Sequence, residues 1–409
     1  MRLRRRLGAA RRLSFHGKRR NVRDLVRFAT FIFAVWGGSC FYMAWRLTGP
    51  LDPGSPLRPA AWVFAAATAI LVPWAMVRQR RPHPPRLMMP AAYTAMSFAA
   101  MLLPPVVLRD LVWGAGVALG AWPDPAVRLA WARDLNAAAL FTGVALTVLG
   151  YLQARRPPRS LCVAVPFPGL HPNLEGFRIV LIADLHAGAT IRKGRIESIA
   201  RLAQGLKPDL VAVAGDLADG HVRDVLPNLA PLRHLRAPLG VFFVTGNHDY
   251  YWDPAGWLRA ARTLGMIPLT NESRVLRRGS ARLVVGGVPD PTGAEFGVAP
   301  RPSASHAFQG TPRRAFRLLL AHQPELADAG ARAGADLIVS GHTHGGQLLP
   351  WALIARRVHR CVAGLCRVDR SWLFVTTGAN YWGAPNRLGV PTEIACLILT
   401  REATGRGGR

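Results

Sequence analysis

Four long apolar segments within the first 155 residues constrain the fold of this chain more than any other feature of its sequence. Each is almost free of charge and close to the roughly 20 residues that span a bilayer as a helix. A cleaved signal peptide would explain one such segment and not four, and the helices of a buried soluble bundle would show a polar face. We therefore predict an all-α transmembrane region of four helices at residues 28–153, with spans at residues 28–45, 59–77, 88–108 and 135–152.

A further apolar stretch, residues 111–122, is short and contains glycine. It either extends the third helix or lies in the membrane interface. Around the membrane region we predict a basic N-terminal segment at residues 1–27, a linker with the first strand at residues 154–176, a second domain at residues 177–400 and a disordered tail at residues 401–409.

Arginine clusters predict the orientation of the helices. Basic residues crowd the N-terminal segment, the second gap (residues 78–87) and the exit after the fourth span, whereas the first gap has only Arg46 and Arg58. By the positive-inside rule, both termini and the second domain face the cytoplasm. We therefore expect a multi-pass protein of the inner (cell) membrane.

Five short polar motifs lie in the second domain, and nearly all follow apolar runs of strand length. Buried parallel strands read as such runs, and ligands at the carboxyl ends of several strands converge on one crevice. The motifs supply carboxylate, carboxamide and imidazole groups but no thiolate, which suits two divalent ions such as Mn, Fe or Zn. The motifs are Asp184-Leu185-His186, Gly215-Asp216-Leu217-Ala218-Asp219, Gly246-Asn247-His248-Asp249, Ala321-His322-Gln323 and Gly341-His342-Thr343-His344.

Each motif alone has an ordinary structural interpretation. A single histidine after a strand, such as His322, is more often hydrogen-bonded than metal-bound, and Asp219 is as easily a turn residue or a supporting residue as a catalytic one. The joint occurrence of five motifs in one order reverses that balance.

This set resembles the calcineurin-like metallophosphoesterase superfamily over residues 160–400, and Gly345-Gly346-Gln347 resembles its membrane-tethered bacterial branch. The resemblance implies an α/β fold in which two mixed sheets pack face to face between helices, a four-layer α/β/β/α sandwich. It also implies a metal-dependent phosphoesterase, a hydrolase of phosphoric ester bonds with manganese among the expected metals.

The resemblance further implies a role for each site residue. His248 would stay off the metals and assist the leaving group, with Asp249 orienting its ring, while a water activated between the ions attacks as hydroxide. The first ion would be held by Asp184, His186 and His344, the second by Asn247, His322 and His342, and both by Asp216.

A late segment, residues 380–387, supplies aromatic residues and Arg387. An arginine fork serves a phosphate as well as a carboxylate. Arg387 either binds substrate phosphate or, as we favour, fixes its loop by pairing with Glu393.

The net charge of +29 does not by itself indicate nucleic-acid binding. Nearly all of the basic residues are arginine in a chain rich in Ala, Gly and Pro, and no nucleic-acid-binding motif is present. We expect anionic membrane lipids as the electrostatic partner and no specific nucleic acid.

Cys361 and Cys366 flank Gly364 and could face each other in a hairpin, but cytoplasmic placement predicts free thiols.

Two functions remain open at this point. The first is a membrane-anchored dimetal phosphoesterase whose substrate is a phosphodiester, such as a lipid-linked or cell-envelope precursor. The alternative is a membrane sensory or transport protein with a non-catalytic metal- or nucleotide-binding domain. Two features favour the enzyme: every position of the motif set is filled, and the membrane segments are expected to lack paired charges.

The predicted topology is tested with a reporter that is active only outside the cytoplasm. Four spans return the chain to its starting side, so a fusion after Arg409 should be silent and one near Asp52 active. Activity of the Arg409 fusion would show that a span has been miscounted.

Overall fold

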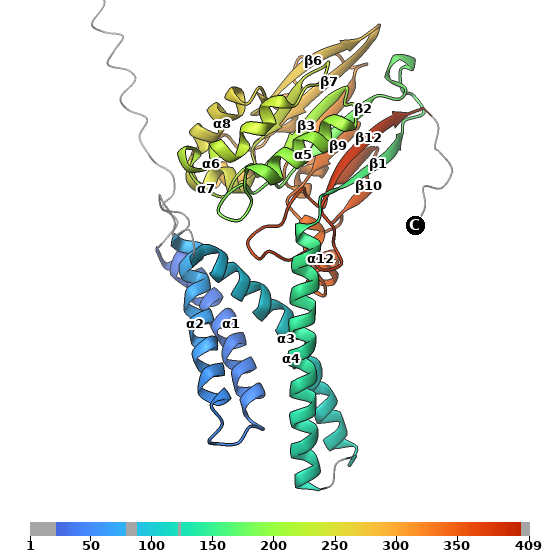
Figure 1. Cartoon of the computed structure of the whole chain (residues 1–409). Helices are drawn as coiled ribbons and strands as arrows, with labels where there is room; N and C mark the ends of the chain where they lie inside the picture. The colour runs from blue at the N-terminus through green and yellow to red at the C-terminus, as the bar shows by residue number, and fades with distance from the viewer. Residues whose placement is uncertain (1–21, 79–87, 122–123, 402–409) are drawn as a thin grey trace, which may run out of the picture.

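The computed structural model describes residues 22–78, 88–121 and 124–401. Most of the predicted basic N-terminal segment and almost all of the predicted tail lie outside the described residues. The rest forms a bundle of long helices beneath an α/β domain (Figure 1).

The bundle consists of α1 Val22–Thr48, α2 Leu57–Arg78, α3 Met88–Ala118 and α4 Pro125–Arg155. Among the described residues three helices, α2, α3 and α4, are long and apolar enough to cross a membrane. The predicted count of four spans is therefore one too high by this measure, because α1 is not among the three helices. Some side chains of α1 lie outside the described part of the structure. The stretch from residue 111 continues α3 as far as Ala118.

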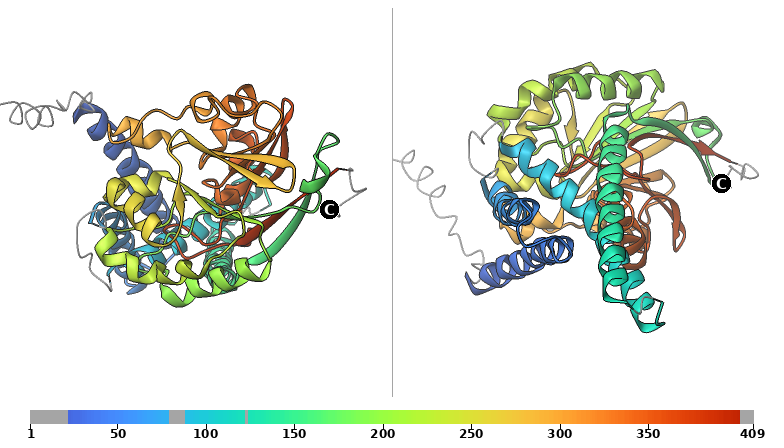
Figure 2. Two further views of the ribbon diagram at one scale, coloured as in Figure 1. Left: turned by 90° about the horizontal axis from the view of Figure 1, so that it is seen from above. Right: turned by 60° about the horizontal axis from the view of Figure 1, so that its bottom comes forward.

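The helices pack in sequence order, α1 on α2, α2 on α3 and α3 on α4. Pro104 and Pro105 lie inside α3, and proline in a helix interior removes a hydrogen bond and bends the helix. The first part of α3 crosses beneath the α/β domain towards α4, and the later part runs beside α4 (Figure 1). The right view of Figure 2 shows that α4 leads directly into the α/β domain.

Paired charges lie just beyond the predicted spans 28–45 and 88–108, within the longer helices α1 and α3. The carboxylate of Asp110 in α3 accepts a hydrogen bond from the Arg46 guanidinium of α1 at 2.7 Å and from the Tyr42 hydroxyl at 2.6 Å, and it also pairs with Arg109. The predicted third span ends at residue 108, but α3 continues through Arg109 and Asp110. Because Arg46 lies in the last turn of α1, the cluster joins α1 to α3 near a helix end.

The α/β domain contains two six-stranded mixed sheets. The first has the order β1-β12-β2-β3-β4-β5, and all its neighbours are parallel except β12 and β2. The second has the order β10-β11-β9-β8-β7-β6, parallel in its centre and antiparallel at both edges. The strands are β1 Arg159–Pro166, β2 Arg178–Ile182, β3 Leu210–Ala214, β4 Val241–Val244, β5 Ile267–Pro268, β6 Glu272–Arg278, β7 Ala281–Gly287, β8 Phe316–Leu320, β9 Leu337–Ser340, β10 Gly364–Val368, β11 Ser371–Val375 and β12 Glu393–Thr400.

Apolar side chains from both sheets form one core between them, including Phe242, Leu318 and Phe374. Helices cover the outer faces, so the predicted α/β fold with mixed sheets is confirmed. The helices of the domain are α5 Lys193–Gly205, α6 Val222–Leu229, α7 Asn247–Trp252, α8 Pro254–Thr263, α9 Pro291–Glu295, α10 Ala304–Ala307, α11 Ala327–Arg332 and α12 Trp351–Val358, with short 3-10 turns η2 Pro172–Leu174, η3 Ala230–His234, η4 Pro324–Leu326 and η5 His344–Gly346.

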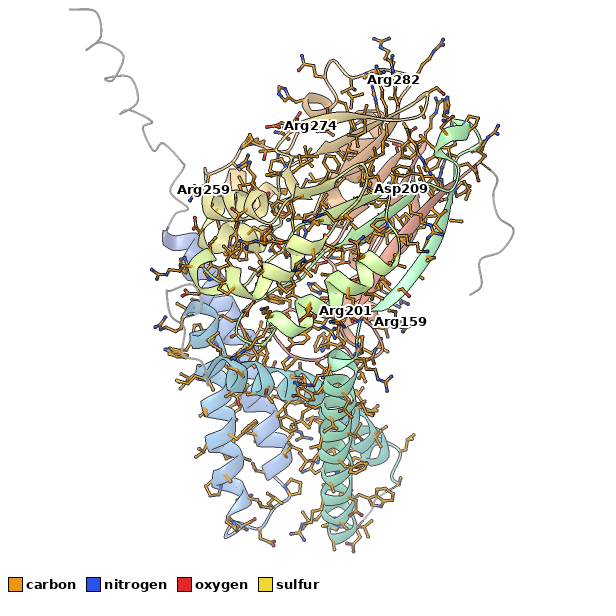
Figure 3. The ribbon with its side chains drawn as sticks, turned by 45° about the horizontal axis from the view of Figure 1, so that its top comes forward. Arg159, Arg201, Asp209, Arg259, Arg274 and Arg282 are labelled. Atoms are coloured by element: carbon orange, nitrogen blue, oxygen red, sulfur yellow. A yellow bond between two sulfur atoms is a disulfide. The ribbon has the colours of Figure 1, made fainter. Side chains whose placement is uncertain are left out.

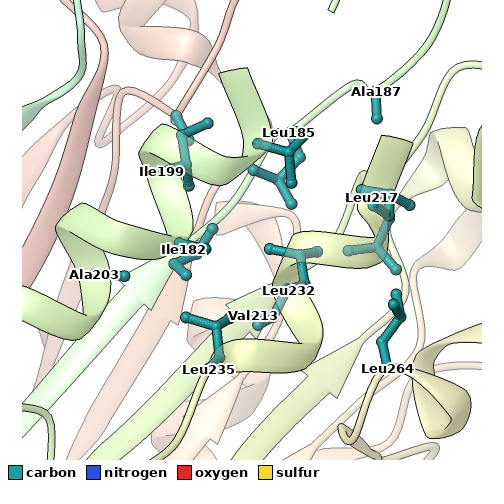
Figure 4. Close-up of a cluster of buried hydrophobic side chains, with 14 of the residues drawn as sticks. Ile182, Leu185, Ala187, Ile199, Ala203, Val213, Leu217, Leu232, Leu235 and Leu264 are labelled. Atoms are coloured by element: carbon teal, nitrogen blue, oxygen red, sulfur yellow. The ribbon is translucent and has the colours of Figure 1, made fainter. Parts of the chain in front are cut away.

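The outer core of the first sheet shows how the sequence places the motifs. Ile196 and Ile199, three residues apart on one face of α5, are both fully buried. Figure 4 shows Ile199 grouped with Ile182 of β2 and Val213 of β3. Packing α5 against both strands fixes the loops that follow them, and these loops carry the first two motifs.

Cys361 and Cys366 form a disulfide, so the prediction of free thiols is wrong. Gly364 between them has φ +85°, a conformation that glycine adopts without strain, and the resulting turn brings the two side chains together.

Arginines labelled in Figure 3 are spread over the outer surface of the α/β domain rather than gathered in one patch.

Candidate metal centre

The motif residues sit where strands β2, β3, β4, β8 and β9 end. Five of them have positive φ: Asp184 (57°), His186 (44°), Asp216 (56°), His342 (69°) and His344 (51°). Non-glycine residues in this conformation typically cost about 1–3 kcal/mol each, and they persist only where the surroundings over-determine them. The concentration of strain at the strand ends marks this region as the candidate site.

The glycines of the motifs permit the close approach of these loops. A Cβ on Gly246 would lie 2.1 Å from Asp216 Oδ1, and one on Gly341 would lie 2.5 Å from Asp184 Oδ2. Gly215 has φ +89°, and a Cβ there would lie 2.6 Å from both Gly246 N and His322 Nδ1. Side chains at these three positions would push the polar groups apart.

A first group of donors consists of Asp184, His186 and His344. Their ligand atoms all lie within 4.8 Å of one another, and all three residues are buried. His186 Nε2 is 3.1 Å from His344 Nε2, which in turn is 3.7 Å from Asp184 Oδ1. The structure thus brings together the three residues predicted for the first ion.

A second group consists of Asn247, His322 and His342. Asn247 Oδ1 lies 3.1 Å from His322 Nε2 and 3.0 Å from His342 Nδ1. The Asn247 amide nitrogen donates to the Tyr251 hydroxyl at 3.0 Å, which turns the carbonyl oxygen of the side chain towards the two histidines.

Asp216 lies between the two groups. Its Oδ2 is 3.3 Å from His322 Nε2 on one side and 3.6 Å from His186 Nε2 on the other. Its Oδ1 accepts the backbone N–H of His248 at 2.8 Å. One carboxylate therefore reaches both donor groups, as the bridging role requires.

Outer contacts fix the orientation of three imidazoles. His322 Nδ1 is 2.7 Å from the Ala214 carbonyl, and His344 Nδ1 is 3.2 Å from the Asn380 carbonyl. His186 Nδ1 is 3.0 Å from Asp219 Oδ1. A carbonyl requires a donor, so Nδ1 of His322 and of His344 carries the proton and Nε2 is left to face the centre, the usual arrangement of a metal-binding histidine.

The electrostatics of the donors fit divalent cations. Burial and then the Arg387 charge hold the pKa of His344 well below its usual range, and burial with the His322 charge lowers that of His342 to about 4. Both imidazoles are therefore neutral, the form that binds metal. Burial opposes the shift at His322, but the Asp216 carboxylate raises its pKa well above the usual value. The centre thus attracts positive charge, and its oxygen and imidazole donors suit Mn, Fe or Zn.

The structure corrects the predicted partner of His248. Its Nδ1 contacts Asp219 Oδ1 at 2.7 Å, and the same oxygen contacts His186. Asp249 instead accepts backbone N–H groups from Gly246, Asp216 and Leu217 at 2.8 to 3.1 Å. Asp249 is the N3 residue of α7 and closes its first turn, so its carboxylate points back into the chain and away from the ring.

Asp219 is therefore the functional residue to which the sequence assigned no definite role. It stands at the second acidic position of its motif, and the only available signal was that position. The Asp219 carboxylate orients two rings, that of His186 in the first donor group and that of His248. Asp249 serves the site by holding the Asp216 loop, and burial, together with the Asp216 charge, raises its pKa to about 7.

The structure also contradicts the prediction that Arg387 binds substrate. Arg387 is fully buried, and its fork donates to the carbonyls of His344 and Asn380, each at 2.6 Å, and to that of Thr377 at 2.5 Å. The alternative pairing with Glu393 is absent from the contacts found, since Glu393 accepts from Thr376 and Thr377. Arg387 fixes the loop that carries His344, and burial lowers its pKa to about 9.

Comparison with known proteins agrees with this geometry. The family model of the calcineurin-like phosphoesterases matches residues 177–346. Over 300 residues the chain is 35% identical to a transmembrane protein with metallophosphoesterase domain from Bos taurus, covering 71% of this chain and 67% of that protein. The chain belongs to the calcineurin-like phosphoesterases. It is thus a metal-dependent phosphoesterase by family, and its apolar helices together with this transmembrane relative support association with a membrane.

Other relatives show the same relationship. The corresponding Danio rerio protein is 33% identical, covering 64% of this chain and 62% of that protein. A Helicobacter pylori metallophosphoesterase is 31% identical, covering 54% of this chain and 59% of that protein. The chain thus spans roughly three fifths to two thirds of the length of these relatives.

Solved structures are more distant. A dimetal phosphatase from Danio rerio aligns at 13% identity and a TM-score of 0.34, covering 50% of this chain and 88% of that chain. The phosphopantetheinyl hydrolase PptH of Mycobacterium tuberculosis aligns at 16% identity and a TM-score of 0.32, covering 51% and 91%.

The role of Asp219 is tested by Asp219→Asn. Loss of the carboxylate should leave the fold intact but weaken metal binding roughly 10- to 100-fold, the usual effect of removing a group that orients a metal ligand. Metal affinity is measured by titration of the purified protein. Asp328→Asn is the matched control, because Asp328 lies in an exposed ion pair with Arg360. Equal affinities in the two variants would contradict the assigned role.

Proposed function

We propose that this phosphoesterase is a dimetal phosphodiesterase anchored in the cell membrane by several helices, with its catalytic domain on the cytoplasmic side that the arginine clusters predict, although the Cys361–Cys366 disulfide is unusual in that compartment. The observation that carries the proposal is the position of Asp216, whose carboxylate lies within 3.6 Å of imidazoles from both donor groups. Two separate donor groups sharing one oxygen ligand are the arrangement of a two-ion centre.

The two ions would be held by the residues named above. When bound, such ions lower the pKa of a water and stabilise both the attacking and the leaving oxygen of a phosphoryl transfer. The protein itself must then place the ester and supply a proton to the departing alkoxide.

His248 is the residue suited to that proton transfer. One of its ring nitrogens lies within 4.8 Å of ligand atoms of His186 and Asp216. Asp219 holds its Nδ1, which leaves Nε2 as the atom that gives the proton to the leaving oxygen. The rings of Tyr251, Trp252 and Trp382 lie 4.9 to 6.0 Å from the imidazole and restrict its rotation.

The placement of the domain supports a membrane-bound substrate. The start of α1 and the end of α4 both lie towards the α/β domain (Figure 1), which agrees with a chain that crosses and returns. We propose a phosphodiester, such as a lipid-linked or cell-envelope precursor, as substrate, membrane lipids as partners of the basic surface, and no specific nucleic acid.

Metal dependence tests the proposal directly. Chelation of the purified protein should abolish hydrolysis of bis(4-nitrophenyl) phosphate, and added Mn should restore it, because all of the proposed donors are oxygen or imidazole groups. Full activity of a metal-stripped sample would refute the dimetal proposal.

The role of His248 is tested by His248→Ala. The variant should keep both metals yet lose roughly two to four orders of magnitude in turnover, the range typical of general acid catalysis. Metal content is measured alongside the rate. If metal is lost with the ring, His248 is a ligand and the proton-transfer role is wrong.

A further inference from the structure

A crevice separates the metal centre from the membrane helix α3. His186 and Asp219 of the centre line one end, and Met89 and Tyr93 of α3 line the other. We propose that this crevice binds the group next to the phosphate in an amphiphilic phosphodiester, a hydroxyl-bearing group of the glycerol or sugar type, whose chain runs along α3. The inference rests on the proposed function and names the class of its substrate.

The wall formed by α3 is apolar and continuous with the membrane helices. Met89 and Tyr93 are 1% and 7% exposed, and they pack in one cluster with Ala75 of α2 and with Ala189, the residue three places after the ligand His186. A methylene chain in the crevice would meet the small accessible parts of these side chains, which keeps part of its apolar surface out of water.

A second loop of the α/β domain, besides the one that contains Ala189, also packs against α3. Gly383 has φ +61°, and a Cβ there would lie 3.0 Å from Met96 Cε of α3. The loop that contains Gly383 also contains Trp382, whose ring packs against His248. Both loops next to the centre thus lie against α3, so the membrane helix is part of the site rather than only an anchor.

The opposite wall is polar and nearly balanced in charge. It contains Thr190, Arg192, His221, Asp224 and Asn228. His221 Nε2 is buried without a hydrogen-bond partner among the described residues, and a buried polar atom in this state costs free energy until a partner arrives. Hydroxyl groups both donate and accept, so they match this mixed set, whereas a second phosphate would meet the Asp224 carboxylate.

The two walls together select the substrate class. A small aryl diester would reach the metal donors but leave both walls unused. A lipid diester with a hydroxyl-bearing headgroup would place apolar atoms on α3 and hydroxyls against α6. The structure thus favours lipid diesters over water-soluble ones through contacts outside the metal centre.

The test uses the full chain with Mn in mixed micelles and compares two substrates, phosphatidylglycerol and bis(4-nitrophenyl) phosphate. Asn228→Leu alters the polar wall and Met89→Ala the apolar wall. Each should lower the ratio of the two kcat/KM values, lipid over aryl, by roughly tenfold or more, the usual effect of losing a pocket contact. Asn173→Leu, at an exposed position of η2, should leave the ratio unchanged.

The outcomes separate the two proposals. If the wild-type protein hydrolyses the aryl diester, and the lipid is not hydrolysed or the ratio is the same in both crevice variants, the crevice inference is wrong and the phosphodiesterase stands. If the wild-type protein hydrolyses neither substrate, the proposed function fails and the inference with it. Using variants on two separate walls keeps the test decisive when one of them does not fold.

Discussion

The concentration of buried ionisable groups around the Asp216 carboxylate is the interaction on which the rest of the structure depends. Asp184, His186 and His322 are almost wholly inaccessible to solvent and lie close to this one side chain. Burying several such groups carries a large desolvation cost, and the positive φ angles of five donors add to it. The apolar core between the two sheets offsets this cost and holds in place every strand end that carries a donor. The resulting centre is complementary to divalent cations.

The sequence indicated that these donors lie together because its signals are local. Each donor directly follows an apolar strand, and the parallel neighbours β2, β3 and β4 necessarily bring their carboxyl ends together. Asp184 and Asn247 therefore fall into the groups to which the family resemblance assigned them. The prediction of an α/β fold succeeded for the same reason, since its strands are continuous buried runs.

The supporting contacts were not predictable in this way. Asp219 and Asp249 are both acidic residues next to the site, and which of them meets His248 depends on how α7 is capped at Gly246, three residues before Asp249. Arg387 is bound by backbone carbonyls, which have no signature in the sequence. The pair Arg46 and Asp110 was missed because α3 continues past Asp110 instead of ending at residue 108, and two adjacent prolines ordinarily signal the end of a helix.

The central claim is that two donor groups share Asp216 and hold two ions. It is tested most directly by metal analysis and electron paramagnetic resonance of the Mn-loaded full chain. Two ions about 3.5 to 4 Å apart are magnetically coupled, so the account predicts two Mn per chain and a coupled spectrum that is lost in Asp216→Ala. A single Mn per chain with the spectrum of an isolated ion would contradict it.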